Sequence, residues 1–485
     1  NLKPTDKVSA DALFASPEGI KVFMANLYSQ MPIEDFNSTP MNGISYNDGG
    51  PNNAGFFPWV ITDEGIGSEH QGITGLGGGD FNWWNEGYKL NRDVNLLFGV
   101  IPGLKVDKKM KDGLLGEASF IRAYTYFALA KRYGGVPLIT KIADANDGEE
   151  AFNVPRSTEK ETWDFVLAYC DTAAIYLGDG DGNKRRATKW SALALKSRAA
   201  LHAASVAKFW DRAPLSGAAV DAKLVGMAKS DAAGYYAKCI SASEAIINSN
   251  IFSLYKASPA NADDAAENYR QMFEDPNRAM NEVIFLKGYT LVGAELGSNQ
   301  DNWGNPNQTR GAWPHPGRFN PVLDLVDQYE NYSNPGHSAP IVTTTDGNLN
   351  YDGYNPTRTY LKFDQTTDVF ADKDARLRAT VILPGSIWKN TEIIIQGGYI
   401  QPDGTLVIEA DASISVGGKT YYTYGASRPE FFSGFSTYGG NMTRSGFGFK
   451  KFLNSKYVGI LGWNFSTTDW IDFRYSEILL NYAEA

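Results

Sequence analysis

Aromatic and planar polar side chains alternate in one loop-like stretch, residues 299–320, and they offer the clearest binding chemistry in the sequence. Trp303 and Trp313 lie there with Asn302 and Arg310. Flat aromatic rings stack on the C–H-rich faces of sugar rings, and amide or guanidinium groups hydrogen-bond to sugar hydroxyls. The Gly, Pro and Asn residues around both tryptophans indicate a loop. We therefore predict that these four side chains belong to a glycan-binding site; the alternative is that both tryptophans fill a hydrophobic core.

Residues that could support a metal or a catalytic centre are sparse. The histidines are scattered, with no metal-binding pair among them: His70, His202, His315 and His337. Asp179, Asp181 and Asn183 have the spacing of the first three ligands of a calcium loop, but Lys184 and Trp190 occupy the positions that need Gly and Glu. We predict a solvated turn there, and no metal or cofactor in the protein. Paired carboxylates for glycoside hydrolysis need not be close in sequence, so a glycan-cleaving enzyme stays open as an alternative.

The composition excludes several classes of function. The chain has 485 residues and a net charge of -10, with 21% charged and 43% hydrophobic residues. This acidic balance argues against binding to nucleic acid and against electrostatic adhesion to an anionic membrane. No apolar run approaches the roughly 20 residues that a spanning helix needs. Cys170 and Cys239 lie within helical patterns, which favours two small buried hydrophobic side chains, although a disulfide stays possible at this stage.

Helical periodicity dominates the first half of the chain and returns at its end. The apolar spacing predicts helices at about 11–31, 83–101, 114–133, 158–177, 188–209, 231–249 and 471–485. The remaining parts, about 32–82 and 252–465, are rich in Gly, Asn, Pro and Tyr and contain only short strand-like runs. We expect these loop-rich parts to form a lobe that the helices support.

The helix predicted at 114–133 has an apolar face too wide for packing on one side only. Phe120, Tyr124 and Phe127 recur at i, i+4 and i+7, and a second apolar stripe lies beside them. Glu117 and Arg122 are charged residues within this aromatic-rich segment, so we expect a buried or bridging ion pair there.

The same segment resembles the hallmark of the SusD/RagB-like outer-membrane nutrient-binding proteins. The matching positions are Glu117, Ala118, Phe120, Ile121, Arg122, Ala123, Tyr126, Phe127, Leu129, Tyr133, Gly134, Val136, Pro137 and Leu138. A second family signature is similar to the end of the chain, at Arg474, Tyr475, Ser476, Glu477, Ile478, Leu480, Tyr482, Ala483, Glu484 and Ala485. So many matches at fixed spacing are more specific than a short motif.

This resemblance implies a mainly α fold: a tetratricopeptide-like scaffold of helical pairs with a large loop-rich lobe that contains a few short β-strands. Residues 1–485 would form one such unit, with further family helices following in the native chain. The resemblance also implies a lipoprotein on the outer face of the outer membrane in a Bacteroidetes-type bacterium. It would bind oligo- or polysaccharide without cleaving it and deliver it to a SusC-like TonB-dependent transporter. The lipidated N-terminal cysteine of such a protein would precede Asn1.

The resemblance also points to a second loop near the ligand. The segment before the helix at 83–101 borders the ligand site in relatives, and here it offers Trp59, Asp63 and Trp83. If Trp84 is the scaffold tryptophan of the family pattern, Trp83 must point elsewhere, and we predict a binding role for all three. The family also includes proteins that capture peptides or other nutrients, which remains the alternative within binding proteins.

Overall fold

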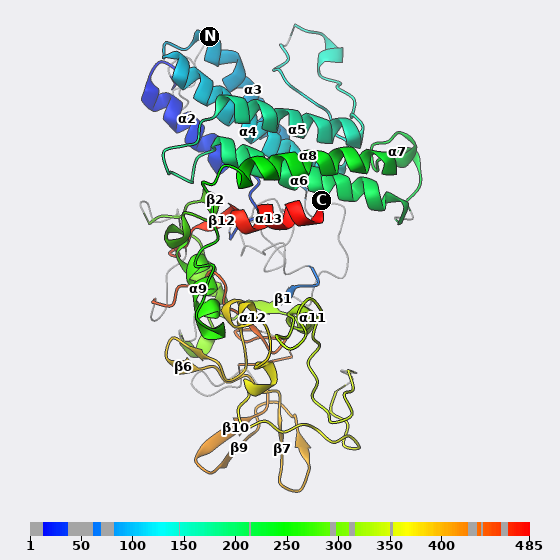
Figure 1. The fold of residues 1–485 in the computed structure, drawn as a ribbon, viewed down its shortest axis with the longest axis vertical. Helices are drawn as coiled ribbons and strands as arrows, with labels where there is room; N and C mark the ends of the chain where they lie inside the picture. The colour runs from blue at the N-terminus through cyan, green and yellow to red at the C-terminus, as the bar shows by residue number, and fades with distance from the viewer. Residues whose placement is uncertain are drawn as a thin grey trace.

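The helices of this protein gather at one end of an elongated molecule, and the loop-rich part forms the other end (Figure 1). The structure is a computed structural model that describes residues 13–36, 62–68, 82–144, 146–212, 215–291, 297–309, 316–349, 353–424, 434–437, 440–456 and 464–485. The mainly α architecture with a few short strands that we expected is confirmed.

At the helical end, neighbouring helices pack side by side. Its α-helices are α2 (Pro17–Ser29), α3 (Trp84–Val100), α4 (Lys108–Tyr133), α5 (Glu159–Tyr176), α6 (Lys189–Phe209), α7 (Ala218–Asp221) and α8 (Ala232–Ile247). The terminal helix α13 (Tyr475–Glu484) runs along the lower edge of this group, beside α6 and α8 (Figure 1).

The loop-rich lobe carries short helices and two-stranded sheets. Its helices are α9 (Ala262–Glu274), α10 (Gln300–Gly304), α11 (Leu323–Gln328) and α12 (Ala375–Thr380). Its antiparallel strand pairs are β1 (Gly65–Gly67) with β3 (Phe319–Pro321), β4 (Val381–Ile382) with β11 (Gly448–Phe449), β5 (Ile387–Trp388) with β6 (Thr391–Glu392), β7 (Tyr399–Ile400) with β8 (Leu406–Val407), and β9 (Ser413–Val416) with β10 (Lys419–Tyr422). The pair β2 (Val283–Lys287) and β12 (Trp470–Arg474) lies where the two ends meet (Figure 1).

The starts of α4 and α13 differ from the sequence-based prediction for identifiable reasons, and one further helix was not predicted. Helix α4 begins at Lys108 rather than 114, because the Asp107 carboxylate caps it by accepting a 2.7 Å hydrogen bond from the Met110 N–H. The last helix begins at Tyr475 rather than 471, because β12 pairs with β2 first. Helix α9 occupies part of a region that we expected to be loop.

Helix α4 is the centre of the helical core, as its wide apolar face predicted. Every residue from Gly116 to Ala130 is buried, and the helix packs against both α3 and α5. It ends at Gly134, whose φ of 70° lies in the left-handed region that favours glycine. The next residue, Gly135, touches the chain before α5 so closely that a Cβ would lie 2.0 Å from the Ser157 carbonyl oxygen.

The ion pair expected in this segment forms at Glu117 and bridges to another segment, and Glu117 and Arg122 do not pair with each other. Glu117 instead binds Arg186 from the chain before α6, with the Arg186 Nη2 2.6 Å from its Oε1. Arg122 donates a 2.7 Å hydrogen bond to the Tyr169 hydroxyl, and its guanidinium lies 4.3 Å from the centroid of the Phe98 ring. Residues five apart on a helix point in different directions, so Glu117 and Arg122 find partners on different neighbouring segments.

Helices α5, α6 and α8 pack closely because their contact faces carry small residues. A capping box at Thr158 starts α5, with Glu161 accepting a hydrogen bond from the Thr158 N–H. Alanines line the buried face of α6. Cys170 and Cys239 are both free and fully buried, so they act as small core residues rather than as a disulfide.

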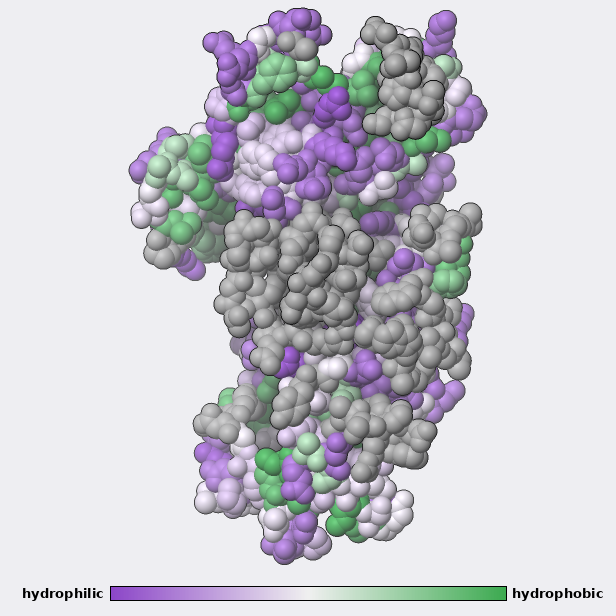
Figure 2. Space-filling view, turned by 180° about the vertical axis from the view of Figure 1, so that it is seen from behind, coloured by the Kyte–Doolittle hydropathy of each residue, from purple (hydrophilic) through white to green (hydrophobic). Residues whose placement is uncertain are grey.

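Apolar residues reach the described surface at both ends of the molecule (Figure 2). Figure 2 shows apolar groups at the lower end, where Figure 1 places the hairpins β7–β8 and β9–β10. Ile400, Ile408 and Val416 are more than half exposed there. Among the residues in the described ranges, no helix has the length and apolar character required to cross a membrane.

Candidate functional site

The two segments that the sequence marked as ligand-side loops lie next to each other. Strand β1 pairs with β3, so Gly65 faces Pro321 and Gly67 faces Phe319. The Val322 N–H donates to the Glu64 carbonyl at 3.1 Å, and the Ser68 hydroxyl donates to the Gly440 carbonyl at 2.9 Å. Asp63, at the start of this segment, is exposed. The strand pair therefore holds Asp63 beside the end of the stretch 299–320.

The short helix α10 buries two of the residues that we predicted to bind ligand. Trp303 is only 3% exposed and Asn302 only 1% exposed. The Trp303 ring packs edge-on against Phe319, with centroids 6.2 Å apart, in a core that also contains Phe36 and Phe452. A ring needs an open face to stack on a sugar. Because protein covers the faces of the Trp303 ring, this side chain supports the loop and does not stack on a ligand.

Trp83 is likewise part of the scaffold. It is 3% exposed and belongs to the core of the helical end. Its backbone N–H donates a 2.7 Å hydrogen bond to the Tyr133 hydroxyl. The assumption that Trp84 is the buried scaffold residue of the pair is reversed: Trp84 is partly exposed and packs on Tyr88 and Tyr133. The remaining predicted site residues, Trp59, Arg310 and Trp313, lie outside the described residues.

Amide side chains at the end of the stretch 299–320 hold neighbouring backbone. The side-chain amide of Gln308 makes two hydrogen bonds to the backbone of Ile394: it donates to the carbonyl at 2.7 Å and accepts from the N–H at 2.8 Å. Asn307 donates to the Asn441 carbonyl at 2.7 Å, and Asn320 accepts from the Arg444 N–H at 3.1 Å. These contacts fix the platform from which the site loops extend.

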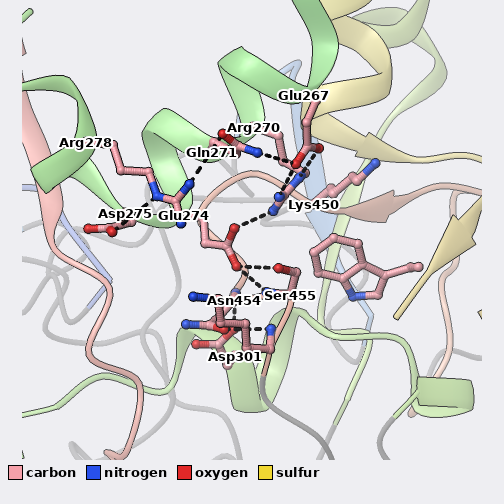
Figure 3. Close-up of polar contacts among 12 residues, drawn as sticks. Glu267, Arg270, Gln271, Glu274, Asp275, Arg278, Asp301, Lys450, Asn454 and Ser455 are labelled. Atoms are coloured by element: carbon pink, nitrogen blue, oxygen red, sulfur yellow. Dashed lines mark hydrogen bonds and ion pairs between the residues drawn. The ribbon is translucent and has the colours of Figure 1, made fainter. Parts of the chain in front are cut away.

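A turn at 453–456 is tied to α10 on one side and to α9 on the other (Figure 3). Asp301 Oδ1 accepts a 2.6 Å hydrogen bond from the Asn454 N–H. Glu274 Oε1 accepts from both the N–H and the hydroxyl of Ser455, each at 2.6 Å. Burial raises the pKa of Asp301 to about 6, although the Asn454 hydrogen bond opposes the shift.

A cavity of about 620 Å³ lies beside α9. Its charged lining residues come from α9, the 3-10 helix at 368–370, α12 and the chain after β11; they are Asp263, Glu267, Arg270, Asp368, Arg378 and Lys450. An apolar wall of Phe370, Val381 and Leu383 completes it. Burial lowers the pKa of Lys450 to about 8, and the nearby Arg270 and Arg378 add to that shift by repulsion. A volume of this size is typical of small-molecule sites.

The turn at 179–183 uses its side-chain oxygens locally. Asp181 accepts from the Asn183 N–H and Asn183 accepts from the Arg185 N–H, each at 3.0 Å. Asp179 lies 3.9 Å from the Lys189 ammonium. Across the described ranges no group of three or more His, Cys, Asp and Glu side chains is placed to hold a metal ion.

Two sequence profiles of known families match the chain. The profile described as "Starch-binding associating with outer membrane" matches residues 74–201, and the profile of the SusD family matches residues 281–485. A segment of 90 residues is 37% identical to SusD-like protein P38 of Formosa agariphila. That alignment covers 19% of this chain and only 17% of the relative, so the match is to a small part of each protein.

Solved structures share the fold over nearly the whole chain. A SusD-like protein from Bacteroides fragilis superposes with a TM-score of 0.65 at 20% identity, covering 100% of this chain and 77% of that one. A SusD-like carbohydrate-binding protein from the same species gives 0.62 at 18% identity, covering 97% and 74%. A laminarin-binding SusD-like protein gives 0.53 at 14% identity, covering 97% and 80%. At these identities the similarity establishes the fold alone.

Sequence reasoning missed the cavity beside α9. The segment Ala262–Glu274 did carry a helical signal, with Tyr269, Met272 and Phe273 at spacings of three and four, but the surrounding loop-rich composition concealed it. Arg270 and Lys450 are 180 residues apart along the chain, and nothing in the sequence indicates that they face one cavity.

Proposed function

Because this chain belongs to the SusD/RagB-like family, we propose that it binds oligo- or polysaccharide at the cell surface and delivers it to a SusC-like TonB-dependent transporter. The family profile that matches residues 74–201 is described as associating with the outer membrane. The proposed protein sits on the outer face of that membrane through an N-terminal lipid anchor. It binds the glycan without cleaving it.

The observation that most supports this proposal is the pairing of β1 with β3. It places the exposed Asp63 beside the stretch 299–320, so two loops that are more than 200 residues apart in sequence approach one side of the lobe. The buried Trp303 and the backbone-binding Gln308 keep the base of this region rigid. A rigid base with loops above it suits a binding protein, since preorganised loops lose less entropy when a ligand binds.

We assign the ligand contacts to a subset of the residues expected from the sequence. Trp313 and Trp59 supply the stacking surfaces, and Arg310 and Asp63 supply hydrogen bonds to sugar hydroxyls. Trp303, Asn302 and Trp83 act as buried support. The proposal is therefore that the site lies above α10, between the segment 62–68 and the stretch 299–320.

Affinity electrophoresis against plant, host and microbial polysaccharides tests this function. Laminarin is a rational first glycan, because one structural neighbour is described as binding it. We expect retardation by one glycan class, weakened at least tenfold in dissociation constant by Trp313→Ala, with no new reducing ends released. Binding of peptides but no glycan would favour the alternative of peptide capture. Release of reducing ends would instead identify an enzyme.

A further inference from the structure

The Lys450 ammonium in the cavity beside α9 forms no salt bridge with the described carboxylates of the cavity wall, although the charge of Glu267 attracts it. The Lys450 ammonium donates a 2.8 Å hydrogen bond to the Arg378 carbonyl and, among the described residues, forms no salt bridge. Its other close neighbour is the Trp388 ring, 5.6 Å from the nitrogen to the centroid. A partly buried ammonium without a counter-ion is costly, so the cavity favours an anion next to it.

The carboxylates in the cavity wall are already engaged. Glu267 binds Arg270 through both oxygens, at 2.7 Å each, and Arg270 also donates to Glu274 at 2.8 Å. Asp368 accepts from the Gln365 N–H at 3.0 Å. Within the described chain, none of these carboxylates forms a salt bridge with Lys450, although the charge of Glu267 attracts it. Figure 3 shows the Glu267, Arg270 and Glu274 side chains forming one chain of contacts next to Lys450.

Arg378 adds a second unmatched donor to the same cavity. One of its terminal nitrogens pairs with Asp263, but that carboxylate is 82% exposed, so water and salt weaken the pair. The Arg378 Nε–H is buried and has no hydrogen-bond partner in the described part of the chain. A guanidinium Nε–H and an ammonium together make a site that favours the oxygens of an anion.

We propose that this cavity is a second binding site, which takes an oxyanion substituent of a bound sugar: the carboxylate of a uronic acid or a sulfate ester. Lys450 and the Arg378 Nε–H bind the oxyanion, while the apolar wall of Val381, Leu383 and Phe370 accommodates the C–H face of the ring. This inference rests on the proposed function, because it assumes that the ligand is a glycan. It adds that the glycan is acidic.

Calorimetry with paired ligands tests the inference. Galacturonan oligosaccharides are compared with their methyl esters, and a sulfated galactan with its desulfated form; the first pair reports carboxylate and the second reports sulfate. We expect at least one acidic member to bind ten times more tightly than its neutral partner. Lys450→Met should reduce that preference to twofold or less and leave the affinity for the neutral partner unchanged. Lys419→Met, which removes an exposed lysine of β10, should retain the preference.

The preference for the acidic ligand over its neutral partner should also fall as the pH rises above 8. Lys450 then loses its proton, whereas Arg270, Arg378, Asp263, Glu267 and Asp368, which face the same cavity, keep their charges. A structural role of Lys450 alone would not produce this pH profile.

The rate at which Lys450 is chemically acetylated, measured by mass spectrometry, gives a test that needs no polymeric glycan. Free galacturonate or sulfate should slow its acetylation at least fivefold, and galactose should not. Neutral and acidic glycans bound equally, with Lys450 unprotected, would overturn this inference and leave the proposed function standing. Absence of binding to every glycan, with Lys450 unprotected, would overturn both.

Discussion

Glu117 of the central helix α4 binds Arg186 of the chain before α6 through two parallel hydrogen bonds, of 2.6 and 3.1 Å. The same carboxylate accepts a 2.7 Å hydrogen bond from the Tyr28 hydroxyl, which in turn accepts from the Ala187 N–H at 2.8 Å. One buried carboxylate thus connects α2, α4 and the start of α6. Burial and the adjacent Glu117 charge raise the pKa of Tyr28 well above its usual value.

We expect Glu117→Gln to lower the free energy of unfolding by about 2 kcal/mol, because charge-assisted hydrogen bonds within the core are lost. Urea denaturation followed by circular dichroism measures the change. Asp112→Asn is the matched control: its partner Lys108 is highly exposed, so the loss should stay below about 0.5 kcal/mol. Equal effects of the two substitutions would contradict the structural role of Glu117.

The stability of the helical end should fall at mildly acidic pH because of His202. Burial lowers the pKa of His202 to about 4, and the Lys131 charge contributes to the shift. Between pH 6.5 and 4 the unfolded chain binds a proton that the folded protein excludes, so stability is present above pH 6.5 and is lost as the pH falls. At pH 5 the free energy of unfolding is lower than at neutral pH by about 2 kcal/mol for this reason.

The variant His202→Gln cannot take up this proton. Its midpoint of thermal unfolding should therefore fall less between pH 7 and pH 5 than that of the native sequence. Parallel profiles of the two proteins would show that His202 is protonated in both the folded and the unfolded state.

Lys450 has the opposite effect at high pH. Its pKa in the folded protein, about 8, lies below the usual 10.5. Between these values the unfolded chain keeps a proton that the folded protein has released, so folding stability rises with pH across this window. We expect Lys450→Met to be more stable than the native sequence by about 2 kcal/mol at pH 7, with the difference shrinking above pH 8. Chemical denaturation at pH 7, 8, 9 and 10 measures it. A less stable variant at pH 7 would contradict the presence of an uncompensated charge.

Separate substitutions of Trp303 and Trp313 should distinguish a tryptophan that stabilises the fold from one that contacts the ligand. Trp303→Ala removes a buried ring and should cost about 4 kcal/mol of stability. Trp313→Ala should change the unfolding midpoint by less than 2 °C and weaken glycan binding. The assignment would fail if Trp303→Ala left stability intact or if Trp313→Ala lowered it as strongly.

Local patterns predicted the scaffold better than the site. The Thr158 capping box and the wide apolar face of α4 depend on residues close in sequence, so spacing and periodicity reveal them. Partner choice depends on the tertiary arrangement: the sequence indicated an ion pair at Glu117 but not its partner, Arg186, which is 69 residues away. Trp303 has a loop-like sequence context, yet α10 turns its ring into a core built by Phe319 and Phe452. Whether an aromatic ring faces solvent or core is decided by packing, and composition does not report it.

The pairing of β1 with β3 is a second contact that the sequence did not predict. Both segments were associated with the ligand side of the protein, Asp63 through a resemblance and 299–320 through its residue types. Their contact at Gly65 and Pro321 could not be read from either segment alone. Long-range strand pairing depends on the whole fold.

The measurement that tests the glycan-binding function most directly is calorimetry of the purified protein, and of its Trp313→Ala variant, against the glycan class that retards it in affinity gels. We predict saturable binding by the native sequence, at least tenfold weaker binding by the variant, and no release of product. Failure of every glycan in the panel to bind the folded protein would contradict the proposed function.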